Sequence, residues 1–367
     1  MLTGIVISVS FLTGCCLILA GILLVAERRI LNYGPCAIDI NDGKKKLEVA
    51  GGGTLLAALA ENDIFIPSAC GGRGTCAYCK VQVAEGGGTV GPVEAPYLTP
   101  DEVKGNVRLS CQVKVRGDLN IVIPDELFSI RRFRGHVEHK RPLTPDIVEM
   151  RIALDEPAEI EFIAGQYIQL ESEPYRGRDA VMRAYSVSSP PSETQAVETV
   201  IRLVPDGICT TWVFEILKEG DSVQFSGPYG EFRLSDSDRP CLFIAGGSGM
   251  APIWSILRDM NEKRVRRPAI YFFGALTQDD LFYTEPLRQL EKDLPDFRYV
   301  PALSREPPDS DWTGERGLIT EVLARQVPDM SEHEAYLCGS PGMIDAAIKV
   351  LTANGMPESQ IFYDKFA

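Results

Sequence analysis

Residues 69–81 read ACGGRGTCAYCKV, and this stretch decides how the N-terminal part of the chain is interpreted. It contains Cys70, Cys76 and Cys79, and Cys111 follows in LSCQV, so the spacing is C-x5-C-x2-C-x31-C. The glycines give the loop enough conformational freedom to bring three thiolates onto one iron–sulfur core. The fourth thiolate then closes the site from a distant loop. The sequence therefore predicts an iron–sulfur cluster with these four cysteines as its ligands.

Zinc also accepts four cysteines, and it remains an alternative at this point. Zinc sites usually pair two C-x2-C motifs, whereas here five residues separate the first two cysteines. A purely structural set of cysteines is the second alternative. The spacing resembles that of plant-type 2Fe-2S ferredoxins, whose first gap is usually one residue shorter. That resemblance implies a β-grasp ferredoxin-like domain, which we expect over residues 35–127.

An uncharged apolar segment, Gly4–Ala26, precedes this region and is long enough to cross a bilayer as a helix. No Lys or Arg comes before it, which is unlike a cleaved signal peptide. Arg28 and Arg29 follow it, and basic residues favour the cytoplasmic side. We therefore expect residues 1–30 to form a single-pass anchor in the plasma (inner) membrane, with the catalytic domains in the cytoplasm.

Composition excludes one class of partner and indicates a compartment. The chain has 367 residues, which suggests two or three domains, and its formal net charge of -14 repels nucleic acid over most of the surface. We therefore expect no nucleic-acid partner. Four of the ten cysteines lie in the ligand-like pattern and the others are scattered through apolar segments, which indicates a reducing compartment.

Two further domains are expected after the cysteine region. Over residues 130–237, short alternating segments such as His136–Val137 are separated by Pro and Gly, which predicts an antiparallel barrel. Over residues 238–367, apolar strands alternate with helices: CLFIA, AIYFFG and AYLCG each precede one. This rhythm predicts a parallel sheet of the nucleotide-binding type. In the cysteine region, Thr54–Glu61 is expected to be helical and Val113–Val115 to be a strand.

The expected barrel carries a group of residues suited to a flavin. Arg183-Ala184-Tyr185-Ser186 offers an arginine for a diphosphate, an aromatic ring and a hydroxyl. About twenty residues later, Gly207 precedes Thr210 and Thr211 at the start of an expected helix, a suitable place for a diphosphate. Ordinary barrel turns explain each piece alone, but they do not explain the order of the pieces.

The expected parallel sheet carries two turns suited to a dinucleotide. The stretch AGGSGMAP follows CLFIA and opens a helix, so a diphosphate can approach its backbone closely. It departs from G-x-G-x-x-G, and a plain strand–helix turn stays open as an alternative. The stretch CGSPGM follows a later strand, where a thiol can sit beside the nicotinamide or simply pack. The residues singled out are Gly246, Gly247, Ser248, Gly249, Met250, Pro252, Cys338 and Gly339.

RAYS, GICTT, GPYGEF, AGGSGMAP and CGSPGM occur in this order. Residues 133–367 thereby resemble the ferredoxin-NADP reductase superfamily. With the cysteine region and the apolar segment ahead of them, the whole chain is similar to the F subunits of the sodium-translocating NADH:quinone oxidoreductases. The resemblance implies Arg183, Tyr185, Ser186 and Thr210 at FAD, Gly247–Pro252 and Cys338 at NADH, and Phe366 near the flavin face. Ser186, Cys338 and Phe366 are the residues expected at the reaction itself.

The cofactors together imply a reaction. A nicotinamide gives two electrons as hydride and a 2Fe-2S cluster accepts one, so a flavin must stand between them. The resemblance implies integral membrane subunits as partners and a quinone as an indirect acceptor. A reductase component of an oxygenase and a non-enzymatic electron carrier remain alternatives. NADH is expected to be preferred over NADPH, because Asp279 and Asp280 follow the strand AIYFFG where a 2′-phosphate needs arginine.

Overall fold

The computed structural model describes residues 12–19, 33–68 and 70–365. The chain divides into two compact units. The first comprises the residues up to Ile66 together with Gly72–Ser129, and the second comprises Pro67–Gly71 together with the residues from Ile130 onward.

The predicted membrane anchor falls mostly outside the described residues. Within it the structure describes a helix over residues 12–19, with mostly exposed side chains. Among the residues that are described, no helix has both the length and the apolar character needed to cross a membrane.

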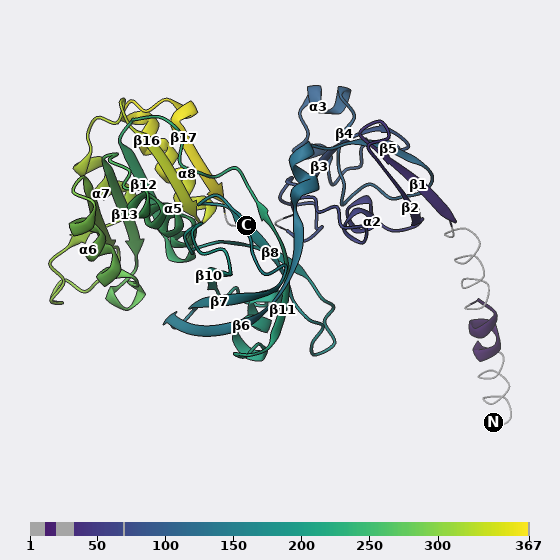
Figure 1. The fold of residues 1–367 in the computed structure, drawn as a ribbon, viewed down its shortest axis with the longest axis horizontal. Helices are drawn as coiled ribbons and strands as arrows, with labels where there is room; N and C mark the ends of the chain where they lie inside the picture. The colour runs from purple at the N-terminus through teal and green to yellow at the C-terminus, as the bar shows by residue number, and fades with distance from the viewer. Residues whose placement is uncertain (1–11, 20–32, 69, 366–367) are drawn as a thin grey trace. The chain divides into compact units, whose positions relative to one another are not determined.

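The first unit is built on a mixed five-stranded sheet (Figure 1) with the strand order β2-β1-β5-β3-β4. Its strands are β1 (Pro35–Ile40), β2 (Lys45–Ala50), β3 (Lys80–Glu85), β4 (Val107–Leu109) and β5 (Leu119–Val122). The predicted helix is present as α2 (Leu55–Ala60), where the Thr54 side chain accepts a hydrogen bond from the Ala57 amide. A second helix, α3 (Pro100–Lys104), begins with a capping box at Thr99.

The prediction of a strand over Val113–Val115 is wrong. The only sheet-like pairing in this segment is one isolated bridge between Lys114 and Thr54. Val113 and Val115 are both buried, at 1% and 0% exposure, and belong to the core of the first unit. Their alternation with exposed Lys114 gives the sequence a strand-like period, although the segment is a loop anchored by two buried side chains.

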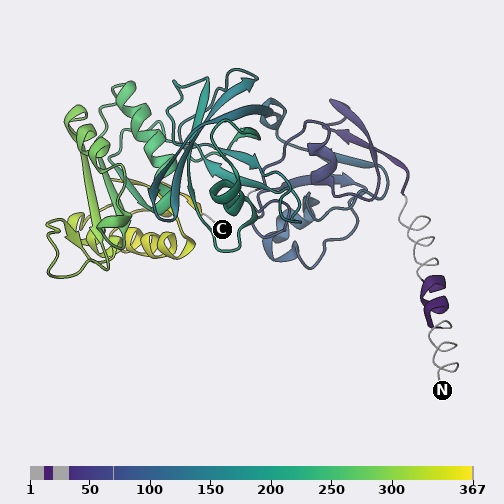
Figure 2. The same ribbon diagram turned by 90° about the horizontal axis from the view of Figure 1, so that it is seen from below.

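The second unit contains a six-stranded antiparallel barrel, as predicted, which Figure 2 shows in the middle of the ribbon. Its strand order is β10-β7-β6-β11-β8-β9. An isolated bridge between Val187 and Thr199 joins the chain after β9 to β10 and closes the barrel. The predicted short strand at His136–Val137 is part of a longer, bulged strand, β6. The strands are β6 (Arg131–Thr144), β7 (Ile147–Glu156), β8 (Tyr167–Glu171), β9 (Met182–Ser186), β10 (Ala196–Arg202) and β11 (Ser222–Tyr229).

The remainder of the second unit is the predicted parallel sheet, with the order β15-β14-β13-β12-β16-β17. Successive residues of β12 face opposite sides: Phe243 packs in the core under α5 and α6, and Ile244 in the core under α7 and α8. Helices therefore cover both faces. The elements are β12 (Cys241–Gly246), α5 (Met250–Glu262), β13 (Ala269–Ala275), α6 (Thr284–Asp293), β14 (Phe297–Leu303), β15 (Glu315–Arg316), α7 (Ile319–Gln326), β16 (Glu334–Gly339), α8 (Pro341–Ala353) and β17 (Ile361–Lys365).

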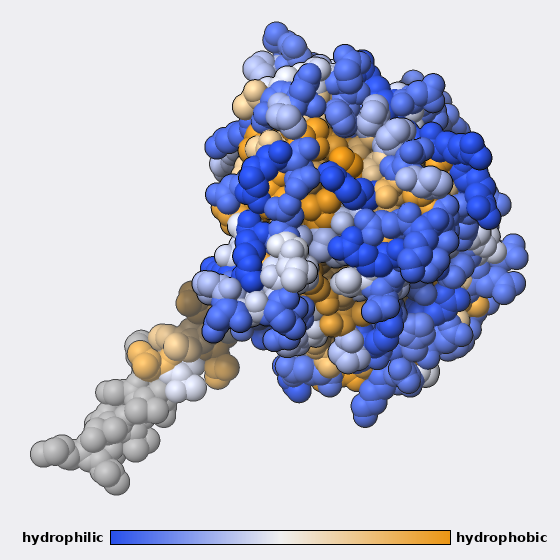
Figure 3. All heavy atoms as spheres, turned by 90° about the vertical axis from the view of Figure 1, so that its left-hand side faces the viewer, coloured by the Kyte–Doolittle hydropathy of each residue, from blue (hydrophilic) through white to orange (hydrophobic). Residues whose placement is uncertain are grey.

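Hydrophilic residues cover most of the face drawn in Figure 3, with apolar patches between them. This agrees with the high charge of the chain, 51 acidic against 37 basic residues.

Candidate functional site

Two of the predicted cluster ligands, Cys79 and Cys111, lie side by side. Cys79 directly precedes β3 and Cys111 follows β4, and these strands pair antiparallel with Lys80 opposite Leu109. The Ser110 amide donates to the Cys79 carbonyl at 2.8 Å and extends the pairing by one step. The two Sγ atoms are consequently 3.3 Å apart, although 31 residues lie between the two cysteines in the sequence. Strand pairing thus brings together the thiols that the spacing predicts to share a centre.

The loop between Cys70 and Cys79 has the conformation that its glycines permit. Gly71, Gly72 and Gly74 all have positive φ, from +64° to +84°, which residues with a side chain rarely adopt. The Gln112 side chain lies beside Gly74 and also donates to the Cys111 Sγ at 3.4 Å. The loop is therefore shaped by the residues around the thiols as well as by its own glycines.

The burial of the cysteines suits a shielded cluster. Cys70, Cys79 and Cys111 are buried, and Cys76 is half-buried. The neighbouring Cys111 and burial together raise the pKa of the Cys79 thiol, so two thiolates here need positive charge beside them, which iron supplies. Among the described residues, no three His, Cys, Asp or Glu side chains form a group arranged to hold a metal. Ligation by all four cysteines stays a prediction.

The flavin motif lies on β9, which pairs with β8. Arg183 stands opposite Leu170 and Tyr185 opposite Ile168, so both side chains leave the same face of the sheet. Tyr185 packs against the barrel core, whereas the Arg183 guanidinium donates to the Met182 carbonyl oxygen at 2.7 Å. Ala184 and Ser186 stand on the other face. Four residues that are contiguous in sequence therefore divide between two faces of the sheet.

Tyr185 has a hydroxyl suited to an added partner. This hydroxyl is buried, and its one neighbouring polar group among the described residues is the Cys209 thiol, a weak hydrogen-bonding partner. Burial raises the pKa of Tyr185, and the neighbouring Cys209 thiol adds to that shift. A buried hydroxyl that has only a thiol beside it gains from a stronger partner, and a bound flavin provides such a group.

The Gly207–Thr211 segment forms a tight turn into α4 (Ile208–Thr211). A Cβ atom at Gly207 would lie 2.5 Å from the Thr210 Oγ1 and 3.0 Å from the Val204 carbonyl oxygen, so the turn favours glycine. The Thr210 hydroxyl accepts a hydrogen bond from the Val204 amide at 3.2 Å, and Thr211 is half-buried. The predicted diphosphate role of Thr210 therefore stays a prediction, since this hydroxyl already stabilises the turn.

The two predicted nucleotide turns meet at the carboxyl edge of the parallel sheet. A Cβ atom at Gly249 would lie 2.2 Å from the Cys338 carbonyl oxygen, and one at Gly246 would lie 3.2 Å from the Met343 Sδ. Gly247 has φ +55° and Gly339 has φ +146°. Glycine at these positions lets the turn before α5 pack against the end of β16. Ser248 is half-buried in this turn, and Pro252 is buried in the first turn of α5.

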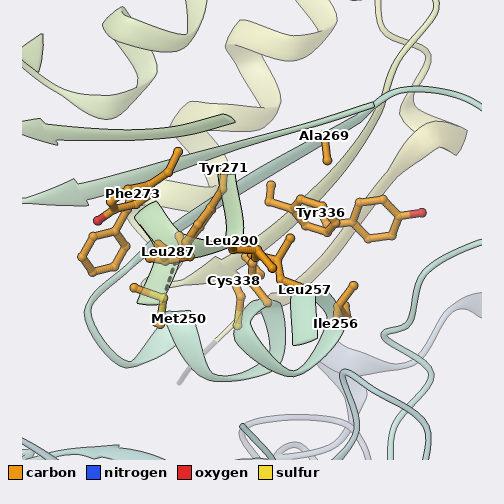
Figure 4. Close-up of a cluster of buried hydrophobic side chains, with 14 of the residues drawn as sticks. Met250, Ile256, Leu257, Ala269, Tyr271, Phe273, Leu287, Leu290, Tyr336 and Cys338 are labelled. Atoms are coloured by element: carbon orange, nitrogen blue, oxygen red, sulfur yellow. Dashed lines mark hydrogen bonds between the residues drawn. The ribbon is translucent and has the colours of Figure 1, made fainter. Parts of the chain in front are cut away.

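The Cys338 side chain is fully buried. Figure 4 shows it among the apolar side chains between the sheet and α5. Burial raises the pKa of this thiol well above its usual range. Met250 is anchored in the same core, where the Tyr271 hydroxyl donates to its Sδ at 3.0 Å. The role of Cys338 at the nicotinamide stays a prediction, and Phe366 lies outside the described residues.

Three family models match the chain in sequence order. The 2Fe-2S iron-sulfur cluster binding domain matches residues 38–116, the oxidoreductase FAD-binding domain residues 134–234, and the oxidoreductase NAD-binding domain residues 243–349. The chain thus has domains for all three predicted cofactors.

Curated relatives match over nearly the whole length. The F subunit of the Na⁺-translocating NADH-quinone reductase from Pseudomonas aeruginosa is 36% identical over 400 aligned positions, covering 98% of each chain. The chain belongs to this family of F subunits. The Neisseria meningitidis member is 33% identical and covers 99% of each chain. Together with the three domains, membership identifies the chain as an NADH oxidoreductase, which excludes the non-enzymatic carrier.

Solved structures share the fold of this F-type chain. The Amycolatopsis cytochrome P450 reductase GcoB is 28% identical with a TM-score of 0.74, covering 90% of this chain and 98% of its own. The ferredoxin reductase in carbazole 1,9a-dioxygenase is also 28% identical, with a TM-score of 0.70 and coverage of 91% and 99%.

At the carboxyl edge of the parallel sheet, the fold of this F-type chain brings together carboxylates that the sequence alone does not indicate. The Gln278 amide donates to the Glu306 carboxylate at 3.0 Å, and the Gln278 side chain donates to Asp311 at 2.9 Å. These carboxylates follow β14 and lie beside the predicted specificity segment. No local pattern marks them, because their position depends on β14 pairing with β13.

Proposed function

We propose that this chain is the NADH-input subunit of a membrane-bound, sodium-translocating NADH:quinone reductase. In this proposal residues 1–30 anchor it in the inner membrane, its catalytic domains lie in the cytoplasm, and integral membrane subunits accept its electrons and pass them toward a quinone. The names of the curated relatives support the complex and the quinone.

The predicted residues have distinct roles in this proposal. When bound, NADH supplies hydride, FAD separates the pair of electrons, and the 2Fe-2S cluster carries them one at a time. Arg183 pairs with the FAD diphosphate, Tyr185 covers the ring, and Ser186 donates a hydrogen bond to the reactive ring nitrogen. The turn from Gly246 to Pro252 holds the NADH diphosphate at the start of α5. The four cysteines hold the cluster.

One observation carries the NADH-to-flavin step. A Cβ atom at Gly247 would lie 3.6 Å from Arg202 Nη1 and 3.8 Å from Ile147 Cδ1, and both residues belong to the barrel. The nucleotide turn therefore adjoins the FAD-binding domain directly. Hydride transfer needs donor and acceptor in contact, about 3 to 3.5 Å apart, and a nucleotide turn that adjoins the barrel supports such a contact.

Cofactor analysis tests the assignment of the cluster. The full chain should contain one FAD and about two irons, and Cys76→Ala should lose the iron while NADH still reduces the flavin. Cys36→Ala is the control, because Cys36 is a buried cysteine of the same unit that lies outside the motif. Zinc in place of iron, or equal iron loss in both variants, contradicts the assignment.

A second candidate function is the reductase component of an oxygenase. The carbazole-dioxygenase reductase covers 91% of the chain at a TM-score of 0.70, which favours this candidate on architecture. Affinity purification of the tagged full chain in mild detergent separates the two. Co-purifying integral membrane subunits support the quinone reductase, and a co-purifying oxygenase supports the alternative.

A further inference from the structure

Helix α5 carries a set of polar contacts to the barrel. The Ser255 Oγ donates to the Ser189 carbonyl oxygen at 2.6 Å, and this hydrogen bond is buried. One turn later, Arg258 pairs with Glu198 (Nη1 to Oε2, 2.7 Å) and with Glu193 (Nη2 to Oε1, 3.2 Å). Ser255 and Arg258 are three residues apart and therefore lie on the same side of the helix.

On the barrel, the carboxylates that bind Arg258 are also held by a second arginine. Arg151 Nη1 lies 3.1 Å from Glu198 Oε1 and contacts Glu193, and Arg151 Nε lies 2.5 Å from Glu138 Oε2. The Glu198 amide donates to the Ser189 Oγ at 3.1 Å. The two places where the barrel receives α5, Ser189 and Glu198, are thereby tied to each other.

This network differs from an isolated surface ion pair. A single exposed pair contributes little to stability because water and salt screen it. Here two arginines are shared among three carboxylates, and the Arg258 and Glu198 side chains are only 25% and 14% exposed. Its several fixed contacts define one orientation of α5 on the barrel.

The contacts between α5 and the barrel lie close in sequence to both predicted cofactor sites. Ser189 follows the flavin motif residue Ser186 by three positions, and α5 begins at Met250, directly after the Gly247–Gly249 turn. At a rise of about 1.5 Å per residue, Ser255 and Arg258 lie about 8 and 12 Å along the helix from Met250. A rigid helical segment therefore links the contacts to the nucleotide turn.

We propose that Ser255 and Arg258 of α5, bound to Ser189, Glu193 and Glu198 of the barrel domain, form a clamp between the NAD-binding and FAD-binding domains. This clamp holds the NADH-binding turn where a bound nicotinamide can pass hydride to the flavin. The inference rests on the proposed NADH-to-FAD reaction and adds positioning residues to it. Because a displacement of about 1 Å can lower the rate a hundredfold, loosening the clamp slows hydride transfer more than it weakens NADH binding.

Anaerobic stopped-flow reduction of the flavin by NADH tests the clamp, using the full chain with its cofactors bound. Arg258→Met should lower the maximal rate at least tenfold, while the NADH concentration for half-maximal rate changes less than threefold and FAD content is unchanged. Arg258→Lys should recover part of the rate. Arg176→Met is the control, because it removes an arginine–glutamate ion pair, with Glu215, between two connecting segments of the FAD-binding domain that include no residue of α5, and it should behave as wild type.

Two results for Arg258→Met overturn the clamp. One is a wild-type maximal rate with a wild-type half-saturating NADH concentration, and the other is a higher half-saturating NADH concentration with an unchanged maximal rate. If Arg258→Met loses FAD, Ser255→Ala decides, since it removes only the hydrogen bond to Ser189: a rate at least threefold lower supports the clamp and a wild-type rate overturns it. A wild-type chain whose flavin is not reduced by NADH overturns the proposed function as well, whereas the other outcomes leave that function intact.

Discussion

Gly249 packs directly against Cys338, so closely that a Cβ atom at residue 249 would lie 2.2 Å from the Cys338 carbonyl oxygen. This contact joins the turn before α5 to the end of β16, and it leaves no room for any side chain. The two predicted nucleotide motifs, almost ninety residues apart, thus meet backbone to backbone.

Gly249→Ala should separate these two turns and weaken NADH binding, because the clash is with backbone that cannot rotate away. We expect at least a tenfold increase in the KM for NADH in ferricyanide reduction, with FAD retained. Gly117→Ala is the control, since it lies outside both nucleotide motifs and no atom lies within 4 Å of a Cβ at that position. Equal KM values in the two variants contradict the prediction.

Asp279→Arg should reduce the preference for NADH over NADPH. Asp280 already accepts hydrogen bonds from the Thr277 amide and hydroxyl, whereas Asp279 is exposed, and Glu306 adds a second carboxylate nearby. A 2′-phosphate within about 4 to 6 Å of such charges loses on the order of 1 to 3 kcal/mol, or ten- to a hundredfold in affinity.

Steady-state kinetics with both nucleotides checks this preference. The wild type should have the higher kcat/KM with NADH, and Asp296→Arg, an equal charge change at the amino end of β14, should leave the ratio unchanged. A wild-type kcat/KM for NADPH equal to that for NADH refutes the assignment.

The buried Glu334–Arg267 ion pair should make the stability of the NAD-binding domain sensitive to acid. Its N–O distance is 2.6 Å and both side chains are about 5% exposed. Burial alone raises the pKa of Glu334, but hydrogen bonds from Ser235, Ser237, Tyr336 and Arg267 outweigh it and lower that pKa to about 2.

An unfolded glutamate has a pKa of about 4.3, so this stabilisation of about 3 kcal/mol is complete above that pH and is lost as pH falls toward 2. About half of it should disappear between pH 5 and pH 3, as measured by urea unfolding followed by tryptophan fluorescence. Glu334→Gln should be less stable at pH 7 and should lose less on acidification. Glu332→Gln, at an 85% exposed side chain, is the control and should follow the wild type.

Removal of residues 1–30 should give a water-soluble NADH-oxidising protein. No predicted cofactor ligand lies in this segment, and each later domain has its own apolar core. Ferricyanide reduction should persist, while activity with the membrane acceptor falls. A truncated chain that cannot retain FAD refutes this division into domains.

Local patterns in the sequence determined the type of each domain. The spacing of Cys70, Cys76 and Cys79, the order of the glycine-rich motifs and the change from short alternating segments to strand–helix units all depend on residues close together along the chain. The same locality explains the error at Val113–Val115, where two buried side chains around an exposed lysine imitate a strand.

Only the tertiary structure decided which distant residues meet. The Cys79–Cys111 contact depends on β3 pairing with β4, and the place of Glu306 beside Gln278 depends on β14 pairing with β13. Arg258 meets Glu198 across 60 residues because α5 packs on the barrel. Each charge alone is indistinguishable in sequence from a solvated surface residue, because its partner is selected by strand order and helix packing rather than by neighbouring residues.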